Sequence, residues 1–145
     1  MILKIIKTVS LSIVLFLMLT AIAIAQEQNP SYIVNVFVNT YGGPYMDELA
    51  DFTTPNFRDN KPKSVWVVDT WKSLKQIKYR KIRSSVIASK VKGNKAVVIV
   101  DATIETKAVK TSQKELYYLI KEDGKWLIND LVVTDEDIDL ENEKL

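Results

Sequence analysis

A regular alternation of residue types between Lys95 and Thr106 constrains this fold more than any other sequence feature. Every second residue from Ala96 to Ile104 is apolar, whereas Asp101 belongs to the opposite, mixed set. Successive side chains of a β-strand point to opposite faces of its sheet, so a period of two predicts a strand with one face in the core. We therefore expect a sheet whose apolar face is covered by another element of the chain.

Two turn sequences bound this strand and its successor. Lys92-Gly93-Asn94 precedes it and Glu122-Asp123-Gly124 follows the next extended segment, and each glycine can adopt the positive φ of a tight turn. The pattern predicts a run of antiparallel hairpins. Within each strand, alternate residues are expected to share a face. These sets are Ile82, Ser84, Val86 and Ala88 in the first strand, Leu116, Tyr118 and Ile120 in the third, and Trp126, Ile128, Asp130 and Val132 in the fourth.

Prolines mark helix starts in the first half of the chain. Asn29-Pro30 combines an N-cap residue with proline at the first helical position, and Gly42-Gly43 ends that element, although its β-branched residues leave a strand open. Pro44 opens a second, short helix. Pro62 opens a third. The apolar stripes expected are Ile33, Phe37 and Tyr41 in the first, Tyr45, Leu49 and Phe52 in the second, and Val67, Trp71 and Leu74 in the third, with Trp66 off that stripe.

Helices followed by hairpins predict an α+β fold, with N-terminal helices packed on one face of a curved, mainly antiparallel sheet of four or five strands. The expected domain covers residues 26–134, which is enough for one domain and too few for two. Residues 135–145 carry six acids against Lys144, and we expect this tail to be mobile.

The N-terminus is typical of an export signal. Lys4 and Lys7 precede an uncharged apolar stretch that ends in Ala23-Ile24-Ala25, a small-x-small cleavage site. We therefore expect a signal peptide over residues 1–25, cleaved after Ala25, and a secreted or periplasmic domain. The alternative is an uncleaved anchor, because the apolar stretch approaches the length that spans a bilayer; membrane contact is expected only in that case.

The composition limits the kinds of functional site that the chain can form. The chain has no cysteine and no histidine, which removes the usual zinc ligands and the Cys–His nucleophile–base pairs. We expect no metal and no cofactor. Ten basic residues against Asp69 lie between Lys61 and Lys92; they form either a solvated face or a patch for anionic lipid, an envelope polymer or an acidic protein. Nucleic acid is excluded as a partner by export and by the lack of an aromatic-rich basic motif.

The order of elements resembles the nuclear-transport-factor-2-like superfamily, a cone-shaped fold. The residues that carry the likeness are the helix end from Phe37 to Gly43, the segment Leu49-Ala50-Asp51-Phe52 with Phe57, and the closing hairpin from Glu115 to Ile128. A cystatin-like sheet that wraps one helix gives a similar profile. The resemblance implies a pocket between the first helix and the sheet, and it implies homodimerisation through the sheet as one assembly state.

Enzymes of that superfamily use a pocket carboxylate as a base beside a hydroxyl donor. The catalytic candidates here are Asp101 and Asp130, with Tyr118 as donor. The candidates for ligand binding are Tyr32, Trp66 and Tyr117, although aromatic residues at these spacings are more often core.

We therefore expect a non-enzymatic exported domain that binds an unidentified ligand, envelope polymer or protein. One alternative is a small isomerase- or dehydratase-like enzyme of the cone fold, which requires a pocket Asp. Another is an interaction module of an envelope assembly system, which requires the N-terminal segment to stay uncleaved.

Overall fold

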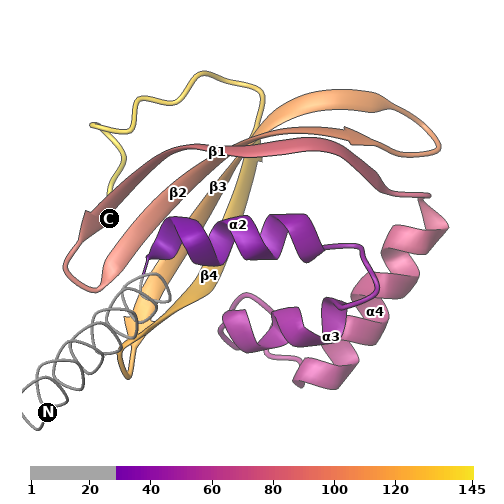
Figure 1. Ribbon diagram of the computed structural model, residues 1–145, viewed down its shortest axis with the longest axis horizontal. Helices are drawn as coiled ribbons and strands as arrows, with labels where there is room; N and C mark the ends of the chain where they lie inside the picture. The colour runs from indigo at the N-terminus through magenta and orange to yellow at the C-terminus, as the bar shows by residue number, and fades with distance from the viewer. Residues whose placement is uncertain (1–28) are drawn as a thin grey trace, which may run out of the picture.

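The computed structural model describes residues 29–145 and shows helices on one side of a four-stranded sheet (Figure 1). The strands are β1 (Arg80–Lys92), β2 (Lys95–Glu105), β3 (Lys110–Glu122) and β4 (Lys125–Thr134), all antiparallel in the order β1-β2-β3-β4. The α+β prediction is confirmed. The expected signal peptide, residues 1–25, and its cleavage after Ala25 lie outside the described residues.

The helices are α2 (Pro30–Thr40), α3 (Met46–Leu49), the 3-10 turn η1 (Ala50–Phe52) and α4 (Lys63–Gln76). Within residues 29–145 no helix is both long and apolar enough to cross a membrane. Figure 1 shows α2 lying along the sheet, with α3 below it in this view and α4 to the right of its C-terminal end. We call the face that α2 covers the inner face and the opposite one the outer face.

The first element is a helix, as its proline and asparagine predict. Asn29 Oδ1 accepts a hydrogen bond of 2.9 Å from the backbone N–H of Ser31, which satisfies one free donor of the first turn. After the helix, Gly42 adopts a φ of +81°, and a Cβ at this position would lie 3.3 Å from the ring of Tyr79. Glycine therefore permits both the turn and the close approach of Tyr79, the residue before β1.

The core lies between α2 and the inner face. Phe37 is its centre, 1 % exposed, with ring centroids of Tyr41, Phe57 and Tyr117 at 5.5, 5.7 and 5.8 Å. The closing hairpin contributes Trp126, which is buried. Other buried members are Val34, Val38, Leu49, Val98, Val100, Leu119 and Ile128.

The burial of the two tryptophans of α4 is the reverse of what the apolar stripe predicted. Trp66 is 8 % exposed and packs on Phe57 at 6.0 Å, whereas Trp71 is 43 % exposed. The helix packs against α3 and η1, not flat on the sheet, so only a narrow face reaches the core. Trp66 belongs to that face, with Val67 and Leu74 half-buried beside it.

β-Bulges break the alternation that the sequence suggested in two strands. One lies between Val86 and Ala88 of β1, so Val86 packs in the inner core while Ala88 packs on the outer face. Another separates Ile128 from Asp130 in β4, because these residues oppose Leu119 and Tyr118, which are adjacent in β3. The extra residue moves Asp130 to the outer face, away from Trp126 and Ile128. Our assignment of Asp130 to their face is wrong.

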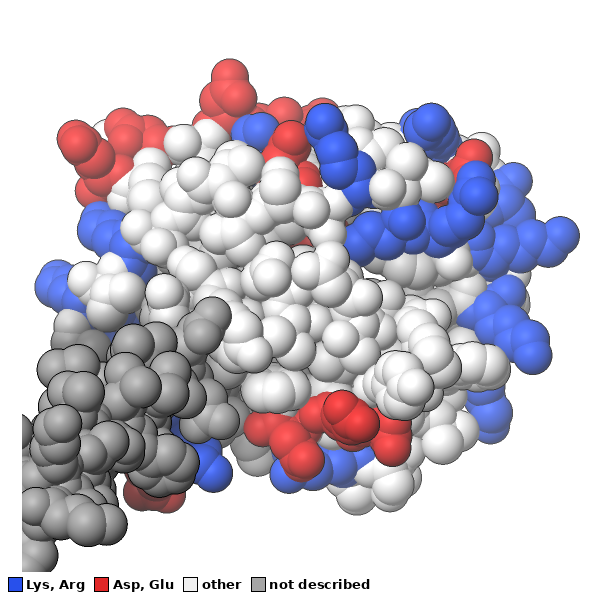
Figure 2. Space-filling view, viewed as in Figure 1, with Lys and Arg blue, Asp and Glu red and all other residues white. Residues whose placement is uncertain are grey.

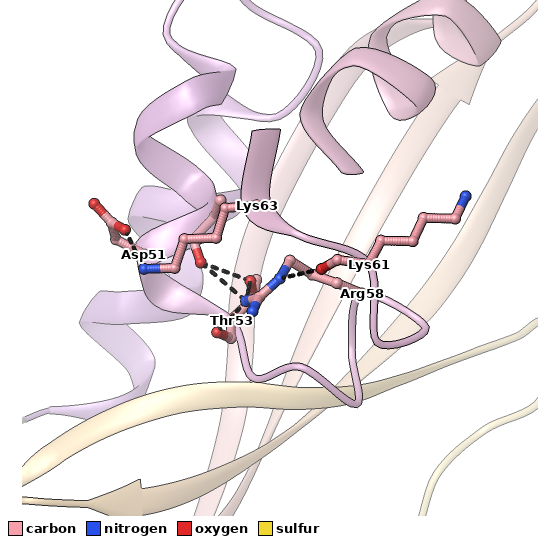
Figure 3. A network of polar contacts seen from close by, with 6 residues as sticks. Asp51, Thr53, Arg58, Lys61 and Lys63 are labelled. Atoms are coloured by element: carbon pink, nitrogen blue, oxygen red, sulfur yellow. Dashed lines mark hydrogen bonds and ion pairs between the residues drawn. The ribbon is translucent and has the colours of Figure 1, made fainter. Parts of the chain in front are cut away.

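A buried arginine holds the loop between η1 and α4. Arg58 donates through Nη1 to the carbonyl oxygen of Thr53 at 2.6 Å and to Thr53 Oγ1 at 2.8 Å, and its Nε reaches the Lys61 carbonyl at 3.4 Å (Figure 3). Nearby, Lys63 Nζ pairs with an Asp51 carboxylate oxygen at 2.6 Å across the exposed side. The planar guanidinium group can donate to several acceptors at once, so these contacts fix the conformation of the loop.

The C-terminal tail, residues 135–145, packs against the domain, and its expected mobility stays a prediction. Ile138, Leu140 and Leu145 pack against an apolar cluster on the outer face. Figure 1 shows the yellow tail running back across the sheet toward β1. Three apolar side chains among the acidic ones are enough to pack the tail against the outer face of the sheet.

Candidate functional site

A carboxylate lies buried at the end of the inner face beyond α2. Alternation along β3 places Glu115 on the same side as Tyr117 and Leu119, both of which are core residues. Glu115 is opposite Val100 of β2 in the register. A glutamate whose side chain is 6 % exposed is rare unless it is paired.

Its partners come from β1 and β3. Tyr117 donates its hydroxyl to Glu115 Oε2 at 2.7 Å, and Gln113 Nε2 donates to Oε1 at 2.9 Å. Lys81 Nζ lies 4.0 Å from Oε2 and donates to the Val38 carbonyl at 3.3 Å. With the rings of Tyr41 and Tyr79, whose centroids are 6.0 Å apart, these residues form what we call the tyrosine–glutamate cluster.

The cluster perturbs the protonation of its members. Burial, followed by the nearby Glu115 charge, raises the pKa of the Tyr117, Tyr41 and Tyr79 hydroxyls. Burial also lowers the pKa of Lys81, and the attraction of Glu115 opposes part of that shift. The cluster therefore encloses one carboxyl group whose hydrogen-bond donors and nearest amine all come from the protein itself.

These contacts limit the chemistry of Glu115. Both of its oxygens already accept hydrogen bonds, and no buried side-chain N or O atom lacks a partner within residues 29–145. A general base must be within reach of the substrate proton, and the Glu115 side chain is only 6 % exposed. In this arrangement the carboxylate ties β1, β3 and the end of α2 together, which is a structural role.

Ionisation of this cluster predicts an alkaline loss of stability. A tyrosine whose folded pKa exceeds its unfolded value of about 10 contributes stability that is complete below pH 10 and is lost as the pH rises further. Lys81, with a lowered folded pKa, acts in the opposite direction, but only up to about pH 10.5. We expect the urea midpoint to fall above about pH 10.5, and to fall less steeply in a Tyr117→Phe variant. Equal slopes in both proteins would contradict the role of Tyr117.

A surface cleft of about 440 Å³ opens beside this cluster, where α4 ends and β1 begins. Tyr79 belongs to the lining of the cleft and to the cluster beneath it. The remaining lining residues are Gly42, Trp71, Leu74, Lys75, Lys78 and Arg80. We call it the cationic cleft. Figure 2 shows Lys and Arg gathering at this end of the molecule.

Charge and aromatic surface meet in the cationic cleft. Lys75 Nζ lies 5.3 Å from the centre of the Trp71 ring, a distance at which the cation is attracted to the ring face. Arg80 is paired with Glu105. Among residues 29–145, no carboxylate lies within 4 Å of the amines of Lys75 and Lys78. Two cations are thus available to an incoming anion.

The aspartates predicted as catalytic lie on the outer face, away from both features. Asp101 is about one-third exposed and sits between Arg83 at 3.4 Å and Lys114 at 3.6 Å. Asp130 is exposed, and its Oδ1 accepts from the backbone N–H of Leu131. The structure brings Asp130 opposite Tyr118 in the register. The Tyr118 hydroxyl, however, donates to Glu143 of the tail.

The three residues predicted to bind a ligand are scattered. Tyr32 is 39 % exposed on α2, and Trp66 fills the core. Tyr117 belongs to the tyrosine–glutamate cluster but is itself buried. None of the three lines the cationic cleft.

Sequence reasoning missed Glu115, although a signal was present. Glu115 alternates with Tyr117 and Leu119, whereas the face expected from the sequence was the other set of this strand, Leu116, Tyr118 and Ile120. The cleft had a signal too. Between Trp71 and Tyr79 the basic residues recur with no acid, which is a cationic and aromatic surface once the helix ends there.

The comparisons with known proteins show a similar fold but no matching family. No model of a known protein family matches the sequence, and no curated protein matches it. A SEC-C motif containing protein from Rhodopseudomonas palustris aligns with a TM-score of 0.59 and 18 % identity, over 75 % of this chain and 81 % of that one. A domain of unknown function with a cystatin-like fold from Nostoc punctiforme gives 0.59 and 15 %, over 81 % and 80 %. At these identities the likeness concerns the fold alone.

Proposed function

We propose that this chain is an exported, non-enzymatic binding domain whose ligand site is the cationic cleft. The observation that carries the proposal is the combination of a half-exposed tryptophan, Trp71, with two amines, Lys75 and Lys78, that have no acidic partner among residues 29–145. Large aromatic residues at a protein surface often mark binding sites. The cone-like arrangement of α2 over the sheet supports assignment to the nuclear-transport-factor-2-like superfamily, which we offer as part of the same proposal.

The cleft favours an anionic ligand that also has an apolar part. Trp71, Leu74 and Tyr79 supply apolar surface, and the surrounding cations supply charge. A phosphate head group attached to an acyl chain has this chemistry, and so does a phosphate-bearing envelope polymer. An exported domain is exposed to both kinds of ligand. They can be distinguished by whether binding requires an acyl chain.

Titration of the exported protein with short-chain lipids tests the site. Dihexanoyl phosphatidylglycerol, kept below its micelle concentration, is added while tryptophan fluorescence is followed; dihexanoyl phosphatidylcholine and glycerol phosphate serve as the other two probes. We expect saturable binding of the first and little of the neutral lipid. Binding of glycerol phosphate with equal affinity would identify the polymer-like ligand, and binding of none of the three would contradict the proposal.

Reversing the charges of Lys75 and Lys78 should weaken this binding at least tenfold. A unit charge about 6 Å from an anion contributes about 0.7 kcal/mol in water, so Lys75→Glu with Lys78→Glu changes the interaction by roughly 2.8 kcal/mol before screening. The matched control is Lys92→Glu with Lys125→Glu, which makes the same change in net charge at two exposed hairpin positions. An equal loss in both double variants would mean that net charge acts and the cleft does not.

Export is tested separately by intact-mass measurement of the protein recovered outside the cytoplasm. We expect a chain that begins at Gln26, because the small-x-small sequence ends at Ala25. A mass that includes residues 1–25 would instead favour a membrane-anchored interaction module.

A further inference from the structure

Helix α4 exposes a row of apolar side chains. Val65, Val68 and Trp71 are each nearly half exposed, and they follow one another at intervals of three residues. Residues three and four apart in a helix are neighbours on its surface, so these side chains form one continuous strip. The opposite side of the helix, which includes Trp66, is the one buried in the core. We call the exposed side the outward side of α4.

The outward side of α4 is also positively charged. Lys72 and Lys75 continue it at further intervals of four and three residues, and Lys78 follows just after the helix ends. Among residues 29–145, no carboxylate lies within 4 Å of these three amines. The one acid of α4, Asp69, is paired with Lys61 at 3.0 Å. Figure 1 draws α4 at one edge of the molecule, and Figure 2 shows Lys and Arg side chains along that edge.

Trp71 lies where the outward side of α4 meets the cationic cleft. Its Nε1–H donates to the Gly43 carbonyl oxygen at 3.5 Å, and Lys75 Nζ lies 5.3 Å from its ring centre. In the loop that contains Gly43, Tyr45 is another exposed aromatic residue. Tryptophan and tyrosine favour the boundary between lipid head groups and acyl chains, because they combine an apolar ring with a polar group. Lysines beside them can extend their amines to the head groups while their stems lie on apolar surface.

We propose that the outward side of α4 docks this protein onto the surface of an anionic lipid bilayer. Val65, Val68 and Trp71 then reach the acyl boundary, and the lysines lie among the head groups. The inference rests on the proposed function, because it takes the occupant of the cationic cleft to be the head group of a lipid in that bilayer.

Charge complementarity, together with the apolar strip, identifies the bilayer as the partner. An anionic bilayer attracts clustered lysines and offers an apolar layer directly beneath its charged groups. A phosphate-bearing polymer supplies the charge without that layer. The strip and the lysines lie on one side of one helix, so a single flat surface can contact both.

Vesicle sedimentation measures the docking. The exported protein that begins at Gln26 is mixed with vesicles of equal parts phosphatidylglycerol and phosphatidylcholine, or of phosphatidylcholine alone. We expect at least tenfold stronger binding to the anionic vesicles. Each lysine near such a surface adds about fivefold to the affinity. Lys72→Gln should therefore lose about that much, although Lys72 does not line the cleft.

A double variant separates docking from binding in the cleft. Val65 and Val68 do not line the cationic cleft, so Val65→Ser/Val68→Ser should weaken vesicle binding at least fivefold and leave the affinity for dihexanoyl phosphatidylglycerol unchanged. The matched control is Val91→Ser/Val109→Ser, which makes the same chemical change at two other exposed valines. It should alter neither kind of binding.

Quenching by brominated lipids shows which part of the protein enters the bilayer. Trp71 is exposed, whereas Trp66 and Trp126 are buried, and residues 1–25 contain no tryptophan. We therefore expect the anionic brominated vesicles to quench mainly Trp71. Most of the quenching should be absent in Trp71→Phe.

The other outcomes are equally decisive. Binding of the short-chain lipid without binding of vesicles would overturn this inference and leave the proposed function standing, whereas failure of both would reject the proposed function as well. An equal loss in Val65→Ser/Val68→Ser and in its control would show that α4 is not the contact. Self-association through α4 in place of vesicle binding would make this side an interface between copies of the chain, which also overturns the inference.

Discussion

Replacing Phe37 by alanine is expected to lower the free energy of unfolding by about 3–5 kcal/mol, the range for removing a large buried aromatic side chain. Phe37 is 1 % exposed and its ring contacts three other aromatic rings, those of Tyr41, Phe57 and Tyr117. The cavity would open between α2 and the inner face, where rigid rings on several elements cannot all move inward. Urea denaturation followed by circular dichroism measures the change.

Tyr32→Ala is the control on the same helix. Tyr32 is 39 % exposed, and substitutions at exposed positions usually change stability by less than about 0.5 kcal/mol. A loss below 1 kcal/mol for Phe37→Ala would show that the aromatic group at the end of α2 is not the centre of the core.

Replacing Glu115 by alanine is expected to cost about 3 kcal/mol or more. The change removes the acceptor of the buried Tyr117 hydroxyl and leaves the Lys81 ammonium, 13 % exposed, without its counter-charge. Leaving one member of a buried charge pair without its partner typically costs about 3–5 kcal/mol. The 4.0 Å separation of Lys81 and Glu115 places the expected value at the lower end.

A second substitution separates the lost charge pair from simple truncation. Lys81→Met in the Glu115→Ala background removes the unpaired ammonium, so the double variant should be more stable than Glu115→Ala alone. Glu115→Gln keeps an acceptor for Tyr117 but also removes the counter-charge of Lys81, so it should cost less than Glu115→Ala and should likewise be relieved by Lys81→Met. If the double variant were less stable than Glu115→Ala, the pair would not be coupled and the cluster would be held by packing alone.

The positions of the elements could be predicted well because their signals are local. Asn29 before Pro30 is a helix-start signal carried by two adjacent residues, and Gly93 and Gly124 adopt positive φ values of 61° and 77° at the two hairpin turns. The alternation after Lys95 is preserved along β2. Each of these features depends on residues within one turn or one strand.

The candidate site was hidden because it depends on which face of each element turns inward. On α4, Trp66 and Trp71 are both apolar, and only packing against α3 and η1 buries the first and exposes the second. In β4, no glycine or proline marks the bulge that moves Asp130 to the outer face. One inserted residue reverses the direction of a side chain.

The sequence alone therefore determines an α+β order, the turns, the helix starts and a charge pattern, because propensity and periodicity act over a few residues. Tertiary structure decides that Glu115 lies among tyrosines from three separate parts of the chain, that Trp71 meets Lys75 and Lys78 at an open cleft, and that the acidic tail covers the outer face. Those features arise from contacts between residues far apart in the chain. Their free energy comes from burial and pairing, which exist only once the elements have packed.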